Sequence, residues 1–140
     1  MIKDYRVTTN QIEMDVEAIH QYLSNSYWCS GLPIETLRLA MENSFCFAVL
    51  QANEQIGFAR LITDYATFAY LADVYILETH QGKGLSKMML NEIFNHPKLK
   101  GLRRIMLATQ DAHGLYEKFG FSKLPNPEIF MENFNPDVYA

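Results

Sequence analysis

Two glycines mark the point where an apolar segment gives way to a helical pattern, and this arrangement suits anion binding. Residues 71–77, LADVYIL, have strand character, and Leu85 begins the spacing of an amphipathic helix. Gly82 and Gly84 lie between them and let the backbone approach a ligand with no Cβ in the way. Because the first turn of a helix leaves N–H groups without partners, the segment predicts a phosphate or pyrophosphate site.

A glycine turn alone is a weak signal, because most such turns serve the backbone only. The segment lacks GxxxxGK[ST], which excludes a P-loop, and it lacks the third glycine of the dinucleotide fingerprint GxGxxG. Lys83 and Lys87 would add positive charge at the helix start. The alternative is that both are solvated surface side chains.

Two stretches of sequence together point to a family. Residues 81–86 read QGKGLS, and residues 112–121 read AHGLYEKFGF. The first resembles [QR]-x-x-G-x-[GA], with a serine at its last small position, and the second resembles A-x-x-LYEKxGF. Both are signatures of the GNAT superfamily of acyl-CoA N-acyltransferases, and the overall resemblance runs from Tyr5 to about Phe134.

The resemblance implies acetyl-CoA as co-substrate. Backbone groups of the central strand would hold the pantetheine arm, as an added β-strand would be held, at Val74, Tyr75 and Ile76. The turn and helix start would hold the pyrophosphate, at Gln81, Gly82, Lys83, Gly84, Leu85, Ser86 and Lys87. Thr109 stands where many members carry an asparagine that binds pantetheine, so Asp111 or His113 is expected to replace that contact.

The same resemblance implies a catalytic tyrosine and leaves the base open. Tyr116 matches the family's general acid; spacing alone would place it in the core beside Leu115 and Phe119, and the surrounding LYEKFGF reverses that preference. Asp73 is an acid in an otherwise apolar strand and is the candidate base. Its alternative role is an ion pair with Arg60 or Arg38, and Glu78 is the second candidate base.

The expected activity is transfer of the acetyl group of acetyl-CoA to a primary amine, by direct attack in a ternary complex. The acceptor is expected to be a small molecule, bound by Tyr27, Trp28 and Arg60, with Arg60 facing a carboxylate. Tyr27 and Trp28 have an equal claim to closing the core beneath their loop. Two alternatives stay open: a protein or peptide acceptor, and an acyl-CoA sensor without turnover.

The order of elements predicts a single α/β domain over residues 1–140. Helices are expected near 16–23 and 34–41, a hairpin at 45–51 and 56–63, the central strand at 67–77, and a helix from 85 that ends before Pro97. A strand at 103–108, a helix at 112–119 and an edge strand at 129–134 follow. The resemblance implies a mixed, mostly antiparallel sheet flanked by helices, with splayed central strands.

Composition excludes several classes of function. The chain has 49% apolar and 20% charged residues and a net charge of −4, with no basic run that would suit nucleic acid. It has no apolar run of membrane-spanning length and no signal peptide, so a cytoplasmic protein is expected. The spacing of Cys29, Cys46 and the four histidines predicts no metal site. A homodimer through the expected C-terminal strand is compatible with the sequence.

Overall fold

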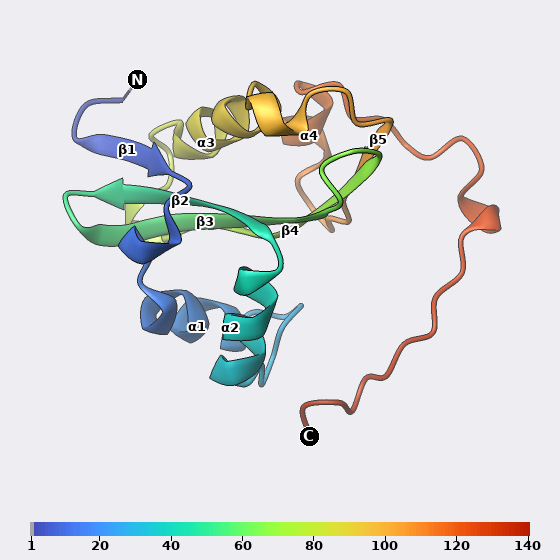
Figure 1. Ribbon diagram of the computed structural model, residues 1–140, viewed down its shortest axis with the longest axis horizontal. Coiled ribbons are helices and arrows are strands. Elements are labelled where there is room, and N and C mark those ends of the chain that lie inside the picture. The colour runs from blue at the N-terminus through green and yellow to red at the C-terminus, as the bar shows by residue number, and fades with distance from the viewer. Residues whose placement is uncertain (1) are drawn as a thin grey trace.

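The computed structural model describes residues 2–140 and places one five-stranded sheet between two pairs of helices (Figure 1). In Figure 1, α1 and α2 lie below the sheet, and α3 and α4 lie above it. In chain order the elements are β1 (Tyr5–Thr8), α1 (Val16–Ser24), α2 (Ile34–Glu42), β2 (Phe45–Gln51), β3 (Glu54–Thr63), β4 (Phe68–Ile76), α3 (Leu85–Phe94), β5 (Arg104–Met106) and α4 (His113–Glu117).

Local signals account for the helix boundaries. The Asp15 carboxylate accepts a hydrogen bond from the Ala18 N–H at 3.1 Å and so caps α1, as its position before the apolar pattern predicts. Pro33 precedes α2, where its missing N–H costs nothing. The α3 helix ends before Pro97, because a proline disfavours helical geometry in the preceding residue.

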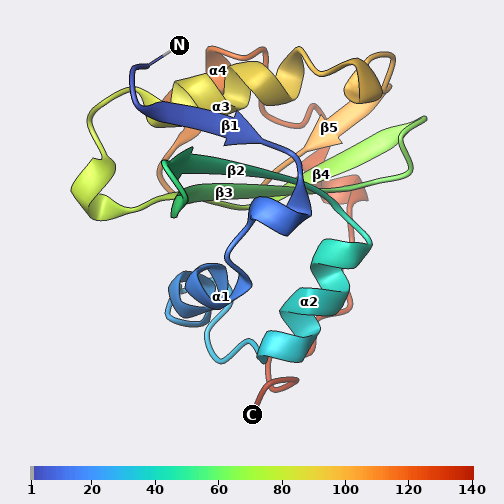
Figure 2. The ribbon, with the colours of Figure 1, turned by 60° about the vertical axis from the view of Figure 1, so that its left-hand side comes forward.

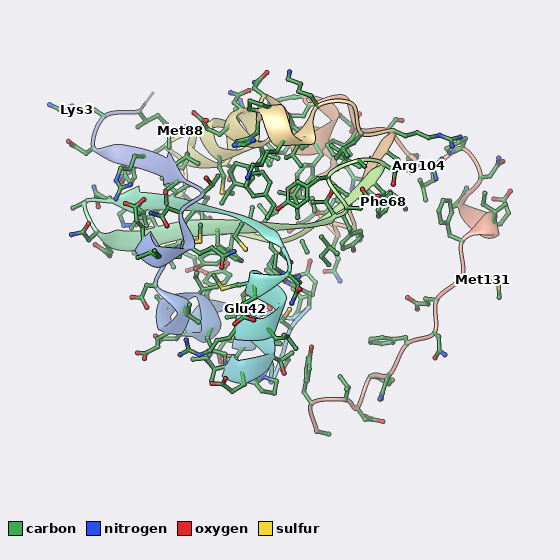
Figure 3. All side chains as sticks on the ribbon, viewed as in Figure 1. Lys3, Glu42, Phe68, Met88, Arg104 and Met131 are labelled. Atoms are coloured by element: carbon green, nitrogen blue, oxygen red, sulfur yellow. The ribbon has the colours of Figure 1, made fainter. Side chains whose placement is uncertain are left out.

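The sheet has the order β1–β2–β3–β4–β5, antiparallel except for the parallel pair β4–β5. That parallel pair joins only residues 68–70 of β4 to residues 104–106 of β5. Phe68 and Arg104 lie at this paired end (Figure 3). Within residues 2–140, the rest of β4 has no strand beside its outer edge. The mixed, mostly antiparallel sheet expected from the sequence is therefore confirmed, and its two parallel strands part after three residues.

Each face of the sheet has its own apolar core. Figure 2 shows the helices that cover the two faces, α3 and α4 on one and α1 and α2 on the other. Leu85, Met89 and Ile93 of α3 pack with Phe47 and Leu61 on one face. On the other face, Phe58 and Ala48 pack with four buried residues of α1 and α2: Ile19, Leu23, Leu37 and Met41. The apolar spacing of these helices predicted these stripes, and each buried side chain of this size stabilises the fold by roughly 1.5–3 kcal/mol.

The last segment of the chain does not form the edge strand expected at 129–134. A single 3₁₀ turn covers Pro127–Ile129, and residues 130–135 run without regular structure to a turn at 136–139, where Tyr139 lies beside Gly31 (Figure 1). Strand hydrogen bonds need a partner edge, and residues 129–134 pair with none in the part of the chain that the structure describes. Pro127 and Pro136 flank this segment and have no N–H with which to extend a ladder. Met131, labelled in Figure 3, is 96% exposed. No helix within residues 2–140 has the length and apolar character to span a membrane.

Candidate active site

A cleft of about 1460 Å³ runs between the unpaired edge of β4, the chain after β5, and α1. Ten of the residues expected from the sequence line it together: Tyr27, Trp28, Asp73, Val74, Tyr75, Ile76, Gln81, Ser86, Asp111 and Tyr116. The expected residues outside this lining are Arg60, Gly82, Lys83, Gly84, Leu85 and Lys87. The structure therefore brings the β4 backbone and the α4 tyrosine to one cavity, and the glycine turn adjoins it through Gln81 and Ser86.

The glycine turn presents a row of free backbone donors. Gly82 and Gly84 have φ values of 83° and 81°, in the left-handed region that favours glycine. Within residues 2–140, no backbone N–H of residues 82–87 donates a hydrogen bond, and Gly84 caps α3 with no side chain. A Cβ on Gly82 would meet nothing within 4 Å, so the turn is open to a ligand. Such a helix start carries partial positive charge and suits a pyrophosphate.

The side chains around this turn mostly hold its shape. The Gln81 amide donates to the Ile76 carbonyl at 2.9 Å, which ties the turn to the end of β4. The Lys83 ammonium donates to the Tyr5 hydroxyl at 3.1 Å, and that hydroxyl hydrogen-bonds His80 Nδ1 at 2.8 Å. Leu85 is buried in the core below α3. The backbone amides of the turn are thus free of hydrogen-bond partners within residues 2–140, whereas the Gln81 and Lys83 side chains are engaged.

A β-bulge in β4 shapes the middle of the cleft. Phe58 pairs with Tyr75 and Arg60 with Ala72, so one residue of β3 faces both Asp73 and Val74. Asp73 adopts a φ of 59°, a left-handed conformation that aspartate tolerates better than most residues. The bulge changes which side chains of β4 point to each face of the sheet, beside the open edge of the strand. The alternation of apolar and polar residues in the sequence did not reveal it.

The Asp73 carboxylate is buried and fully engaged. Its Oδ2 accepts from Arg60 Nε at 2.8 Å, and its Oδ1 accepts from Trp28 Nε1 at 3.1 Å and from the Cys29 thiol at 3.5 Å. Arg60 also donates to the Ser44 hydroxyl at 3.1 Å. The ion pair weighed as the alternative role of Asp73 is therefore confirmed, and its partner is Arg60. Arg60 was expected to face a carboxylate of the acceptor. Its guanidinium is instead paired with Asp73, and the residue is outside the cleft lining.

Two cysteine thiols near this pair are held neutral. Burial and the Asp73 charge raise the pKa of Cys29 to about 12, and burial raises the pKa of Cys46 to about 12. A thiol with such a pKa is a poor nucleophile at neutral pH. Cys29 therefore serves the Asp73 network rather than covalent catalysis.

Tyr116 lies on the α4 wall of the cleft. Its ring packs edge-on against Phe121, with ring centroids 5.9 Å apart, and the residue is buried. Burial raises the pKa of its phenol above 10.0. Within residues 2–140 its hydroxyl has no hydrogen-bond partner, although the residue lines the cleft. The nearby Thr109 hydroxyl accepts from the Ala112 N–H at 3.1 Å, whereas Asp111 lines the cleft with an exposed carboxylate.

Aromatic rings also line the cleft. Tyr22 of α1 stacks on Tyr75 of β4, with centroids 3.8 Å apart and planes inclined by 9°. Tyr27 and Trp28 contact each other edge-on and are 65% and 41% exposed, so neither closes the core. Sequence reasoning missed the part that Glu54, Gln55 and Tyr70 play in the lining. No sequence spacing signals these residues, because distant segments bring them to the cleft.

Comparison with known proteins identifies the family. A family model described as Acetyltransferase (GNAT) family matches residues 13–121. A Gibberella zeae protein named as an acetyltransferase is 38% identical over 138 residues, covering 82% of this chain and 77% of that protein. The [ribosomal protein bS18]-alanine N-acetyltransferase of Haemophilus influenzae is 33% identical over 97 residues, 61% of this chain and 64% of that protein.

A solved structure shares the whole architecture. It is a GNAT-family protein from Xanthomonas campestris pv. campestris, with 40% identity, a TM-score of 0.95 and coverage of 100% of this chain and 99% of that one. Within residues 2–140 there is no cluster of three or more metal-ligating side chains. The matched family model, the fungal relative and this structure lead to one conclusion: the chain belongs to the GNAT acetyltransferase family.

Proposed function

We propose that this protein transfers the acetyl group of acetyl-CoA to a primary amine of a small molecule, by direct attack within a ternary complex. GNAT acetyltransferases use acetyl-CoA as co-substrate. The observation that carries the proposal is the placement of Tyr116 on the same cleft as the open β4 edge. The residue is buried, but its hydroxyl is accessible and has no hydrogen-bond partner in residues 2–140, and the turn with its free amides adjoins the cleft at Gln81 and Ser86.

The chain offers a binding surface that suits each part of acetyl-CoA. The free N–H groups of residues 82–87 fit the pyrophosphate, because they lie at the start of α3, and the start of a helix favours anions. The unpaired edge of β4 at residues 74–76 suits the amides of pantetheine, in the manner of an added strand. We assign Asp111 to the position of the missing asparagine contact, since the Thr109 hydroxyl already accepts a hydrogen bond from the Ala112 N–H just before α4.

The chemistry requires a proton donor beside the sulfur. A neutral amine attacks the thioester carbonyl, a C–N bond forms, the C–S bond breaks, and the departing thiolate takes a proton. We assign that proton to the Tyr116 hydroxyl, whose raised pKa keeps it protonated at neutral pH. The tyrosinate is then reprotonated from water in the open cleft.

The proton that the amine loses has a less obvious acceptor. Asp73 was the sequence candidate, but its two oxygens accept three hydrogen bonds, one of them from an arginine. Each of these donors stabilises the anion and weakens it as a base. We therefore propose that Asp73 positions Trp28 and the loop after α1, and that the amine's proton leaves to water.

Two variants test these assignments. Tyr116→Phe removes only the hydroxyl and is expected to lower kcat by about 10²–10⁴, the range for loss of a general acid, with the affinity for CoA unchanged. Asp73→Asn is expected to leave the acidic limb of the pH profile of kcat/KM in place, because Asp73 is not the group that takes the amine's proton. Thiol release from acetyl-CoA measures kcat, and calorimetry measures CoA binding. A Tyr116→Phe enzyme with full kcat would refute the acid assignment, and loss of the acidic limb in Asp73→Asn would make Asp73 the base.

A peptide acceptor is the second candidate, because the Haemophilus influenzae relative is named for the alanine of a ribosomal protein. A peptide must enter the cleft as an extended chain, past the loop that the Trp28–Asp73 hydrogen bond fixes. Short peptides with N-terminal alanine therefore belong in the acceptor panel beside small amines. Turnover of the peptides alone would replace the small-molecule proposal.

A further inference from the structure

The cleft carries charge of one sign only. Its lining includes five carboxylates, and none of its lining side chains within residues 2–140 is a lysine, arginine or histidine. The five are Asp15, Glu54, Asp73, Glu78 and Asp111. An acceptor with a carboxylate or phosphate group would find no counter-charge there, and its burial beside these acids would be unfavourable.

Two of the five acids are already neutralised or engaged. Asp73 is paired with Arg60, and Asp15 caps α1 through the Ala18 N–H. Glu54, Glu78 and Asp111 have neither an ion pair nor a side-chain hydrogen bond in the part of the chain that the structure describes. Their charges are therefore available to a ligand in the cleft.

The aromatic wall supplies a second, independent feature that suits a cation. Tyr22 and Tyr75 stack, and Trp28 leaves part of its indole exposed to the same cavity. The faces of such rings attract ammonium groups. Burial is the main cause that raises the pKa of Tyr22 and of Tyr75. The Glu78 charge adds to the rise for Tyr22, and the Asp15 charge adds to it for Tyr75, so these acids lie close enough to act on the stacked pair.

We propose that the acceptor is an aliphatic diamine or polyamine, whose second ammonium group lies among Tyr22, Glu54 and Glu78 while its neutral amine attacks the thioester. This inference rests on the proposed function and names its substrate class. The anionic pyrophosphate of CoA does not conflict with these acids, because its donors are the amides of residues 82–87, outside the cleft lining apart from Ser86.

Three acceptors of equal length and similar amine basicity test the charge directly. They are 1,4-diaminobutane, butylamine and 4-aminobutanoate, in which the far end is positive, neutral or negative. We expect kcat/KM to fall in that order, with the diamine at least tenfold better than the carboxylate. We also expect KM for the diamine to rise with salt, because exposed charges are screened. Equal kcat/KM for all three, or a preference for 4-aminobutanoate, would overturn the inference.

Matched variants locate the effect. Glu78→Gln and Glu54→Gln are each expected to raise KM for the diamine about three- to fivefold, as befits exposed charge pairs, and to leave KM for butylamine unchanged. Glu92→Gln, an exposed acid of α3 outside the cleft, is the control and is expected to change neither. Equal effects on the diamine and butylamine would refute a charge contact.

The outcomes distinguish a failure of the diamine preference from a failure of the proposed acetyltransferase function. If butylamine and 4-aminobutanoate are acetylated as well as the diamine, the acetyltransferase function stands and only the charge preference fails. If no amine releases thiol from acetyl-CoA while calorimetry shows CoA binding, the proposed function itself fails. Turnover of a basic peptide without turnover of the diamine or of a polyamine such as spermidine would overturn the small-molecule class.

Discussion

Removal of the Asp73 carboxylate is the most informative single perturbation, because three segments meet on it. The side chain is 5% exposed and its partner Arg60 is 15% exposed, so both charges are largely withdrawn from water. Its oxygens also hold the Trp28 indole and the Cys29 thiol. In Asp73→Ala, all three donors lose their acceptor, and an alanine must adopt the left-handed φ of 59°.

The expected loss of stability follows from these contacts. Breaking a buried ion pair from one side costs about 3–5 kcal/mol, and the residual exposure of Arg60 favours the lower end. A left-handed conformation adds about 1 kcal/mol for alanine. Asp73→Ala is therefore expected to lower the free energy of unfolding by about 4 kcal/mol, a large share of the 5–15 kcal/mol typical of a domain. Asp73→Gly is expected to lose about 0.5–1 kcal/mol less, because glycine accepts this backbone but is more flexible when unfolded.

Urea unfolding measures these differences, and Trp28 provides a local signal. It is the only tryptophan of the chain, so its fluorescence reports the loop that Asp73 holds, while far-UV circular dichroism reports the whole fold. Asp73→Asn is the matched control, since it keeps the size and the left-handed preference of the side chain, removes the charge and replaces one acceptor oxygen with an NH₂ donor. If Asp73→Ala loses less than 1 kcal/mol, or if alanine and glycine are equally stable, the buried pair or the backbone argument is wrong.

Three further predictions follow from local geometry. Gly57→Ala would place a Cβ 2.5 Å from Ile76 Cδ1 and 2.9 Å from the Tyr75 carbonyl oxygen, and we expect a loss of about 2–3 kcal/mol in urea unfolding, because the backbone atom cannot move aside. Gly84→Asp puts a carboxylate at the free amides, so calorimetry should show no CoA binding; unchanged affinity would contradict the pyrophosphate assignment. The pKa of Cys46 is about 12 in the folded protein and about 8.5 in an unfolded chain. Its protonation thus contributes stability that is complete below pH 8.5 and is lost as the pH rises toward 12. In Cys46→Ala the fall of the unfolding free energy between pH 9 and 11 should be shallower, by about 1.4 kcal/mol per pH unit, and an identical slope would refute the shift.

Much of the fold was predictable because its signals are local. The helix starting at Leu85 and the cap at Asp15 follow from apolar spacing and from one side chain each. The glycine turn was predictable for the same reason, since only its two glycines tolerate the observed φ values without strain. These features depend on neighbours a few residues away.

The features that sequence reasoning missed depend on distant partners. The bulge at Asp73 arises from the register of β4 against β3. One extra residue in β4 shifts that register, and the alternation of apolar and polar residues in the sequence does not show where such a residue is inserted. The Tyr22–Tyr75 stack joins residues more than fifty positions apart, and the choice of Arg60 over Arg38 as the partner of Asp73 required the actual pairing of strands. The strand expected at 129–134 does not form, because these residues pair with no strand edge in the part of the chain that the structure describes.

The reversal for Arg60 changes what the cleft selects. As a free arginine it would have drawn an acceptor with a carboxylate, and the aromatic loop would have closed over an amino acid. As the partner of Asp73 it neutralises one buried acid, and it leaves the cleft lined by Glu54, Glu78 and Asp111 with no cation in the described lining to balance them. One ion pair between β3 and β4 therefore shifts the expected acceptor from a zwitterion to an oligoamine, since the sign of the remaining charge decides which second group is stabilised there.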